Sequence, residues 1–129
     1  MKVLLLMILG HLFADYTLQG CLANLKSKGW WKEQCEQHGF DLHKYRHDYI
    51  CGLACHSLYW TLVTFLPLFF FTQIPDMVLF AIVAINTLFH MWIDDLKANK
   101  FKINLVQDQF LHVAQIIVTC GVVYGVFWF

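Results

Sequence analysis

Residues 77–97 read MVLFAIVAINTLFHMWIDDLK, an apolar run in which Asn86, His90, Asp94 and Lys97 recur at intervals of three or four residues. An α-helix has 3.6 residues per turn, so this spacing places the four polar side chains on one face. The other faces are apolar and suit contact with lipid. The stretch predicts a membrane-spanning helix over residues 77–94 whose polar stripe is turned away from the lipid.

Three further stretches have the length of a bilayer-spanning helix, which needs about 20 residues. They cover residues 1–20, 49–71 and 105–129. Of the 129 residues in the chain, 59% are hydrophobic and only 14% are charged, whereas a soluble domain has about a quarter of its residues charged. We therefore expect a single all-α domain over residues 1–129, an integral membrane four-helix bundle in contact with the lipid bilayer.

The charge balance and the cysteines exclude other classes of protein. Nine basic and nine acidic residues cancel, so no overall field would attract nucleic acid. The five cysteines are odd in number and contain no C-x-x-C pair, which argues against a disulfide framework.

Most charged residues lie in two connecting segments, residues 21–48 and 95–104. Four spans place both segments on one side of the membrane and both termini on the other. Lysine and arginine are concentrated in these segments, so the positive-inside bias predicts cytoplasmic loops and external termini in the inner membrane. Trp30 and Trp31 favour an interfacial segment between the first two spans.

The other spans also carry polar residues, although each charged group inside a membrane costs a few kcal/mol unless it is paired. The first span has His11, Asp15 and Gln19. The second has His56, and the fourth has Asp108, His112, Gln115 and Thr119. The rise of 1.5 Å per residue, combined with antiparallel topology, brings these groups to similar depths in the cytoplasmic half of the bundle. We expect one buried cluster made of His11, Asp15, His56, His90, Asp94, Asp108 and His112.

Imidazole and carboxylate together are suitable ligands for a divalent ion such as Zn, Mn, Fe or Ni, and zinc is the first choice. An aspartate four residues from a histidine on a helix can bind the same ion, or it can orient the imidazole. The simpler interpretation is a network of hydrogen bonds between helices, each worth about 0.6 kcal/mol. The number of ions and the role of His56 stay open.

Three motifs suggest a family. Residues 10–19 match G-H-L-x-A-D-x-x-L-Q, residues 90–97 match H-x-x-x-D-x-x-K, and residues 108–112 match D-Q-x-x-H. In this order they resemble the motifs of a family of small integral membrane proteins from bacteria and their phages, whose function is unknown. The resemblance covers essentially the whole chain except residues 21–47. It implies that the motif residues form a site, without naming a reaction.

The first functional hypothesis is a metal-dependent hydrolase acting on a lipid or phosphorylated substrate at the cytoplasmic leaflet. The predicted ligands would hold one or two ions, and Asp94 could serve as general base if it is not a ligand. Lys97 would hold a phosphate as a point charge, although an ordinary snorkelling lysine is an equally good interpretation. Gln19 and Gln109 would donate hydrogen bonds to an oxyanion.

Two alternatives belong to other classes of protein. The same residues could line a pathway for a metal ion, a proton or a small solute. The far end of the bundle is apolar, so a conducting path would require a homo-oligomer. Alternatively, the protein is a non-catalytic membrane subunit whose polar network only specifies helix packing.

Overall fold

The structure is a computed structural model that describes residues 2–127. All regular structure within these residues is helical. The helices are α1 (Lys2–Phe13), η1 (Ala14–Leu18), α2 (Leu22–Leu25), α3 (Lys28–His38), α4 (Leu42–Tyr45), α5 (Asp48–Phe71), α6 (Asp76–Ala98) and α7 (Leu105–Phe127). The prediction of an all-α protein is confirmed for the described part of the chain.

Within residues 2–127, three helical stretches are long and apolar enough to cross a membrane. They are Leu42–Phe71, Asp76–Ala98 and Leu105–Phe127, which agree with three of the four predicted spans. Their outer faces expose large apolar side chains such as Phe80, Val106 and Phe110. Such extensive apolar surface is typical of contact with lipid.

The first predicted span differs from the other three. Its helical part consists of the 12-residue α1 and the five-residue π-helix η1. A fourth membrane crossing, and with it the four-helix bundle, therefore stays a prediction. Residues 1, 128 and 129, which the predicted spans included, lie outside the described residues.

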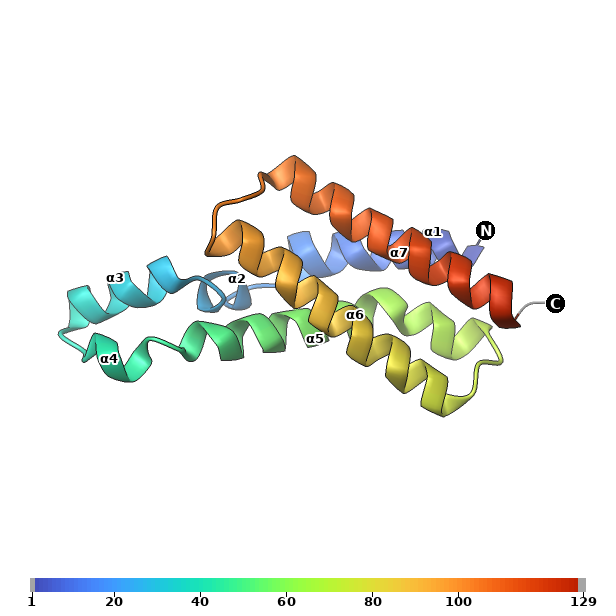
Figure 1. The fold of residues 1–129 in the computed structure, drawn as a ribbon, viewed down its shortest axis with the longest axis horizontal. Coiled ribbons are helices and arrows are strands. Elements are labelled where there is room, and N and C mark those ends of the chain that lie inside the picture. The colour runs from blue at the N-terminus through green and yellow to red at the C-terminus, as the bar shows by residue number, and fades with distance from the viewer. Residues whose placement is uncertain (1, 128–129) are drawn as a thin grey trace.

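The long helices run back and forth along the molecule (Figure 1). α1 begins and α7 ends at one end, together with the turn between α5 and α6, whereas α2 and the α6–α7 link lie nearer the other end. α5 is the central helix and packs against both α1 and α6, and α7 packs against α1 and α6. This order brings the polar stripes of α1, α5, α6 and α7 to one common region.

The segment between α1 and α5 forms a helical extension. α3 and α4 project beyond the long helices, roughly in line with α5 (Figure 1). Ser27 caps α3 by accepting a hydrogen bond from the backbone of Trp30, and the ring of Trp31 stacks on Tyr45 with centroids 6.2 Å apart. The location of this helical extension on the membrane surface stays a prediction.

Two helices approach closely at Gly10. A Cβ atom at this glycine would lie 2.9 Å from the carbonyl oxygen of Val63 on α5. Pro67 lies four residues after Val63 on α5. Because proline has no N–H, it cannot donate the usual helical hydrogen bond to the Val63 carbonyl. The absence of a side chain at Gly10 lets α1 approach α5, and His11 follows directly in the sequence.

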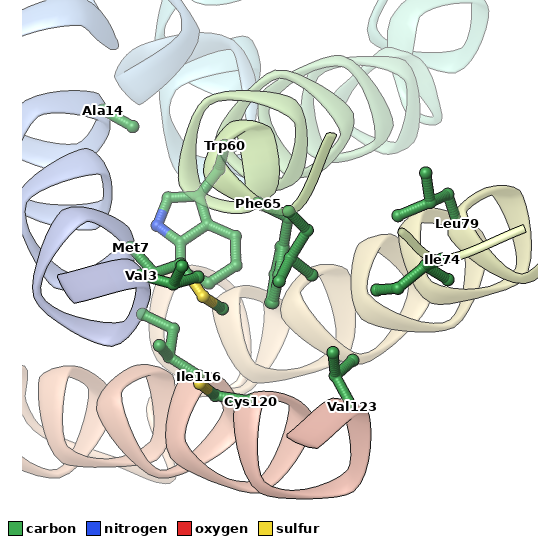
Figure 2. Close-up of a cluster of buried hydrophobic side chains, with 11 residues drawn as sticks. Val3, Met7, Ala14, Trp60, Phe65, Ile74, Leu79, Ile116, Cys120 and Val123 are labelled. Atoms are coloured by element: carbon green, nitrogen blue, oxygen red, sulfur yellow. The ribbon is translucent and has the colours of Figure 1, made fainter. Parts of the chain in front are cut away.

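A buried apolar cluster fills the end of the molecule that holds the chain termini (Figure 2). Its members come from all four long helices and include Val3, Met7, Phe65, Ile116 and Val123. Trp60 belongs to the same cluster, and its indole nitrogen points toward α1 in Figure 2. The polar residues gather on the other side of this indole.

Candidate metal centre

The structure brings all seven predicted ligand residues into one buried cluster. α1 supplies His11, η1 supplies Asp15, and α5 supplies His56. α6 supplies His90 and Asp94, and α7 supplies Asp108 and His112. Asp15 lies in a π-helical turn, a rare form that is found frequently at functional sites. The predicted convergence is therefore present in the fold.

The carboxylate of Asp94 lies at the centre of the cluster. Its Oδ2 atom is 3.2 Å from Nε2 of His56 and 3.7 Å from Nε2 of His90. Its Oδ1 atom is 3.4 Å from Nε2 of His112. Three imidazoles from three different helices thus direct the same ring nitrogen toward one carboxylate.

Two other carboxylates flank this centre. Oδ1 of Asp108 lies 3.3 Å from Nε2 of His112, and Oδ1 of Asp15 lies 3.8 Å from Nε2 of His56. Asp15 also approaches Nδ1 of His11, at 3.5 Å. The cluster therefore contains three acidic side chains, each within 4 Å of at least one imidazole nitrogen.

Three aromatic rings are in mutual contact at the edge of the apolar cluster. The ring of His90 stacks on both Trp60 and His112, with centroid distances of 4.0 Å and 4.1 Å, and the Trp60 and His112 centroids are 5.4 Å apart. The indole of Trp60 also donates a hydrogen bond of 2.9 Å to Nδ1 of His11. Trp60 therefore positions two of the four histidines.

His11 has a different role from the other histidines. Because its Nδ1 accepts the hydrogen bond from Trp60, a neutral His11 ring carries its proton on Nε2. That tautomer can donate a hydrogen bond but has no free lone pair for an ion. The structure thus places His11 beside the centre as an acceptor from Trp60, and its predicted role as a ligand stays a prediction.

Most imidazole nitrogens of the cluster have no hydrogen-bond partner. Among the described residues, Nδ1 of His56 and of His112, both nitrogens of His90 and Nε2 of His11 are buried without one, whereas Nε2 of His56 and of His112 faces carboxylate oxygens at 3.2–3.4 Å. Each buried unsatisfied polar group costs about 1–3 kcal/mol. A ligand bound to these nitrogens would remove this cost.

The distances in the cluster match those between the ligands of a metal ion. Two ligand atoms at about 2.0–2.1 Å from a tetrahedral Zn²⁺ are about 3.3 Å apart. The separations around Asp94 are 3.2, 3.4 and 3.7 Å. Two groups of three residues have ligand atoms close enough to hold an ion, Asp15–His56–His90 and His90–Asp94–His112. Both groups include His90, and neither includes His11 or Asp108.

Two lysines reach the carboxylates. Nζ of Lys26 lies 2.6 Å from Oδ2 of Asp94, and Nζ of Lys97 lies 2.7 Å from Oδ2 of Asp108. Lys97 was predicted from its position on the polar face of its helix. Lys26 was not, because it follows a short helix in a connecting segment and no local periodicity relates it to Asp94.

The predicted amide donors lie at the edge of the cluster. Nε2 of Gln109 is 3.3 Å from Oδ2 of Asp15 and 3.2 Å from Oδ2 of Asp108, so it bridges two carboxylates. Gln19 donates to the backbone carbonyl of Asp15 instead. Trp60 was missed by the sequence reasoning, although its place one helical turn after His56 was a usable signal.

Comparison with protein-family models, curated proteins and solved structures finds no match to the chain. The resemblance to small membrane proteins of bacteria and phages therefore stays a prediction.

Proposed function

We propose that the protein binds one divalent metal ion, with zinc as the first candidate, inside a helical membrane domain. The ligands would be His90, Asp94 and His112, whose ligand atoms all lie within 4.8 Å of one another, and the alternative set is Asp15, His56 and His90. The observation that carries the proposal is the convergence of three buried Nε2 atoms on Asp94 at the separations of metal ligands. Histidine and aspartate are an ordinary ligand set for zinc.

The proposed location is the inner membrane, with the site in its cytoplasmic half. The basic residues of the connecting segments support this orientation through the positive-inside bias. Lys26 and Lys97, which contact the cluster, come from these connecting segments or from the helix end next to them. The cluster would therefore be reached from the cytoplasmic side.

The reaction that best suits such a site is hydrolysis of a lipid or phosphorylated substrate. A bound zinc ion would act as a Lewis acid and would bring the pKa of a water ligand toward about 7. If Asp94 is a ligand, as its central position favours, Asp108 is better placed than Asp94 to act as general base. Gln109 would orient Asp15 and Asp108 through its amide.

The first test is elemental analysis of protein purified in detergent without a histidine tag. We expect about one zinc ion per chain in the wild type and a loss of at least about 90% in His90→Ala, because His90 belongs to both candidate ligand groups. His43→Ala is the matched control, since His43 is exposed on α4, outside the cluster.

Circular dichroism would verify that both variants remain folded. If zinc is absent from the wild type after growth with added zinc and without chelator, the metal proposal is wrong. Retention of zinc in a folded His90→Ala variant would contradict the proposed ligand set.

A second candidate function is transport of an ion or proton. The observation in its favour is that polar contacts continue past the histidines toward the apolar end. Gln115 donates to Asn86 at 2.9 Å, and Thr119 donates to the same Asn86 side chain at 3.0 Å. Zinc-flux or proton-flux measurements in proteoliposomes would test it. The apolar cluster beyond this point supports a closed pocket, so we expect no flux.

A further inference from the structure

Lys26 is an unusual feature of the cluster. Its side chain is only 13% exposed, and its ammonium group lies 2.6 Å from the carboxylate that three histidines approach. Lysine is rarely buried to this degree without a specific partner or role. Specific contacts must therefore hold Lys26 beside Asp94.

The backbone around Lys26 is held in place by three separate contacts. A Cβ atom at Gly52 would lie within 2.8 Å of the Lys26 nitrogen, so α5 leaves space there for the chain. The indole of Trp31 donates to the carbonyl of Leu25 at 2.9 Å. The amide of Asn99, just after α6, donates to the carbonyl of Lys26 at 3.1 Å. Lys26 is thus fixed between α5 and α6 with its side chain directed at Asp94.

Lys97 provides a second ammonium group at the same cluster. It pairs with Asp108 at 2.7 Å, and its side chain is 34% exposed. Because His112 lies 3.4 Å from Asp94 and 3.3 Å from Asp108, the two lysine-bound carboxylates flank a single imidazole. Both lysines therefore pair with carboxylates that contact His112.

A divalent ion bound to Asp94 would compete with Lys26 for this carboxylate. The Lys26 ammonium group would then lie beside the ion without its present partner. A buried positive charge is unfavourable without a counter-ion, so the metal-bound site would attract an anion.

We propose that Lys26 and Lys97 form a phosphate-binding subsite that becomes available when the metal binds. This inference rests on the proposed metal site. Without metal, each lysine neutralises a carboxylate. When the ion shares the charge of Asp94, the Lys26 ammonium is released to bind a phosphate group as a point charge, together with Lys97. The phosphate group belongs to a phosphorylated lipid headgroup or to a soluble phosphate compound.

The test measures binding of radiolabelled inorganic phosphate to detergent-purified protein, with and without stoichiometric zinc. We expect binding only to the zinc-loaded wild type. Lys26→Met and Lys97→Met should each weaken it by at least about tenfold while retaining zinc, and Lys26→Arg should retain binding because it keeps the charge. In the absence of phosphate, Lys26→Met should bind zinc more tightly, because a competing cation has been removed.

Lys100→Met is the matched control. Lys100 forms a lysine–aspartate pair of the same 2.7 Å length, but its partner Asp95 is not one of the residues of the cluster. This variant should leave both zinc and phosphate binding unchanged. Unchanged phosphate binding in zinc-loaded Lys26→Met, or no binding to the zinc-loaded wild type, would overturn the inference while the metal site stands.

Zinc stoichiometry is recorded in the same samples, so failure of the metal proposal is recognised separately by the absence of zinc. Competition then identifies the source of the phosphate group. Displacement by short-chain phosphatidate at concentrations well below those of glycerol phosphate would indicate a lipid headgroup. Equal competition would indicate a soluble phosphate compound. Competition by neither would overturn the inference.

Discussion

The two ends of the helical domain bury their residues in opposite ways. At the end with the chain termini, Val3, Met7, Phe65 and Val123 pack as an apolar cluster that needs nothing more from its surroundings. At the other end, equally buried imidazoles and carboxylates leave ring nitrogens without partners. Trp60 separates the two, packing on the apolar cluster and stacking on His90. The same helices thus provide an apolar core and a buried polar cluster.

Removing Asp94 should have the largest effect. Asp94→Ala deletes the group that three histidines and Lys26 approach, and it leaves a buried lysine unpaired. Breaking a buried ion pair in this way costs about 3–5 kcal/mol, and zinc binding should be abolished. Thermal unfolding and elemental analysis measure the two effects. Zinc bound at wild-type stoichiometry would contradict the central position given to Asp94.

A substitution in the apolar cluster should lower the stability of the protein without affecting zinc binding. Phe65→Ala removes a fully buried ring and should lower the free energy of unfolding by about 3 kcal/mol, through lost packing and a residual cavity. Zinc stoichiometry should stay at the wild-type value, because the ring lies outside the ligand groups. Equilibrium unfolding in detergent, followed by circular dichroism, gives the first quantity. Loss of zinc from folded Phe65→Ala would show that the two ends are not independent.

Addition of zinc should stabilise the polar end selectively. A ligand that binds only the folded state, present at 100 times its Kd, raises the free energy of unfolding by about 2.7 kcal/mol. We expect this increase in the wild type and in Phe65→Ala, and none in His90→Ala. A chelator should reverse it. The Tm measured by differential scanning fluorimetry provides the comparison, and an equal increase in all three proteins would indicate non-specific binding.

The smallest effect is expected at Trp60, which contacts both the apolar cluster and His90. Trp60→Phe retains an aromatic ring beside His90 but removes the indole donor to His11. The loss of one buried hydrogen bond should cost about 1 kcal/mol. Zinc affinity should fall by less than about tenfold, because His11 is a neighbour of the centre and not one of its ligands. A larger loss, measured by competition with a chelating dye, would assign His11 or Trp60 a direct role.

Much of the fold could be predicted because its signals are local. The lengths of the apolar runs indicated α5, α6 and α7 to within a few residues, although α6 continues one turn beyond the predicted span. The first span is the exception, since η1 follows α1 directly and only the spacing of His11, Asp15 and Gln19 was visible in the sequence. A π-helical turn has no simple sequence signal, because it depends on the packing around it.

The positions of His56, His90, Asp94 and His112 within their apolar runs already predict that these residues are buried at similar depths. Helical periodicity and the cost of polar groups in lipid require the polar stripes to face each other. Tertiary packing, in contrast, places Asp94 at their centre, pairs His11 with Trp60 and brings in Lys26 from a distant segment. These contacts depend on the rotation and close approach of whole helices at Gly10 and Gly52, which local periodicity does not specify.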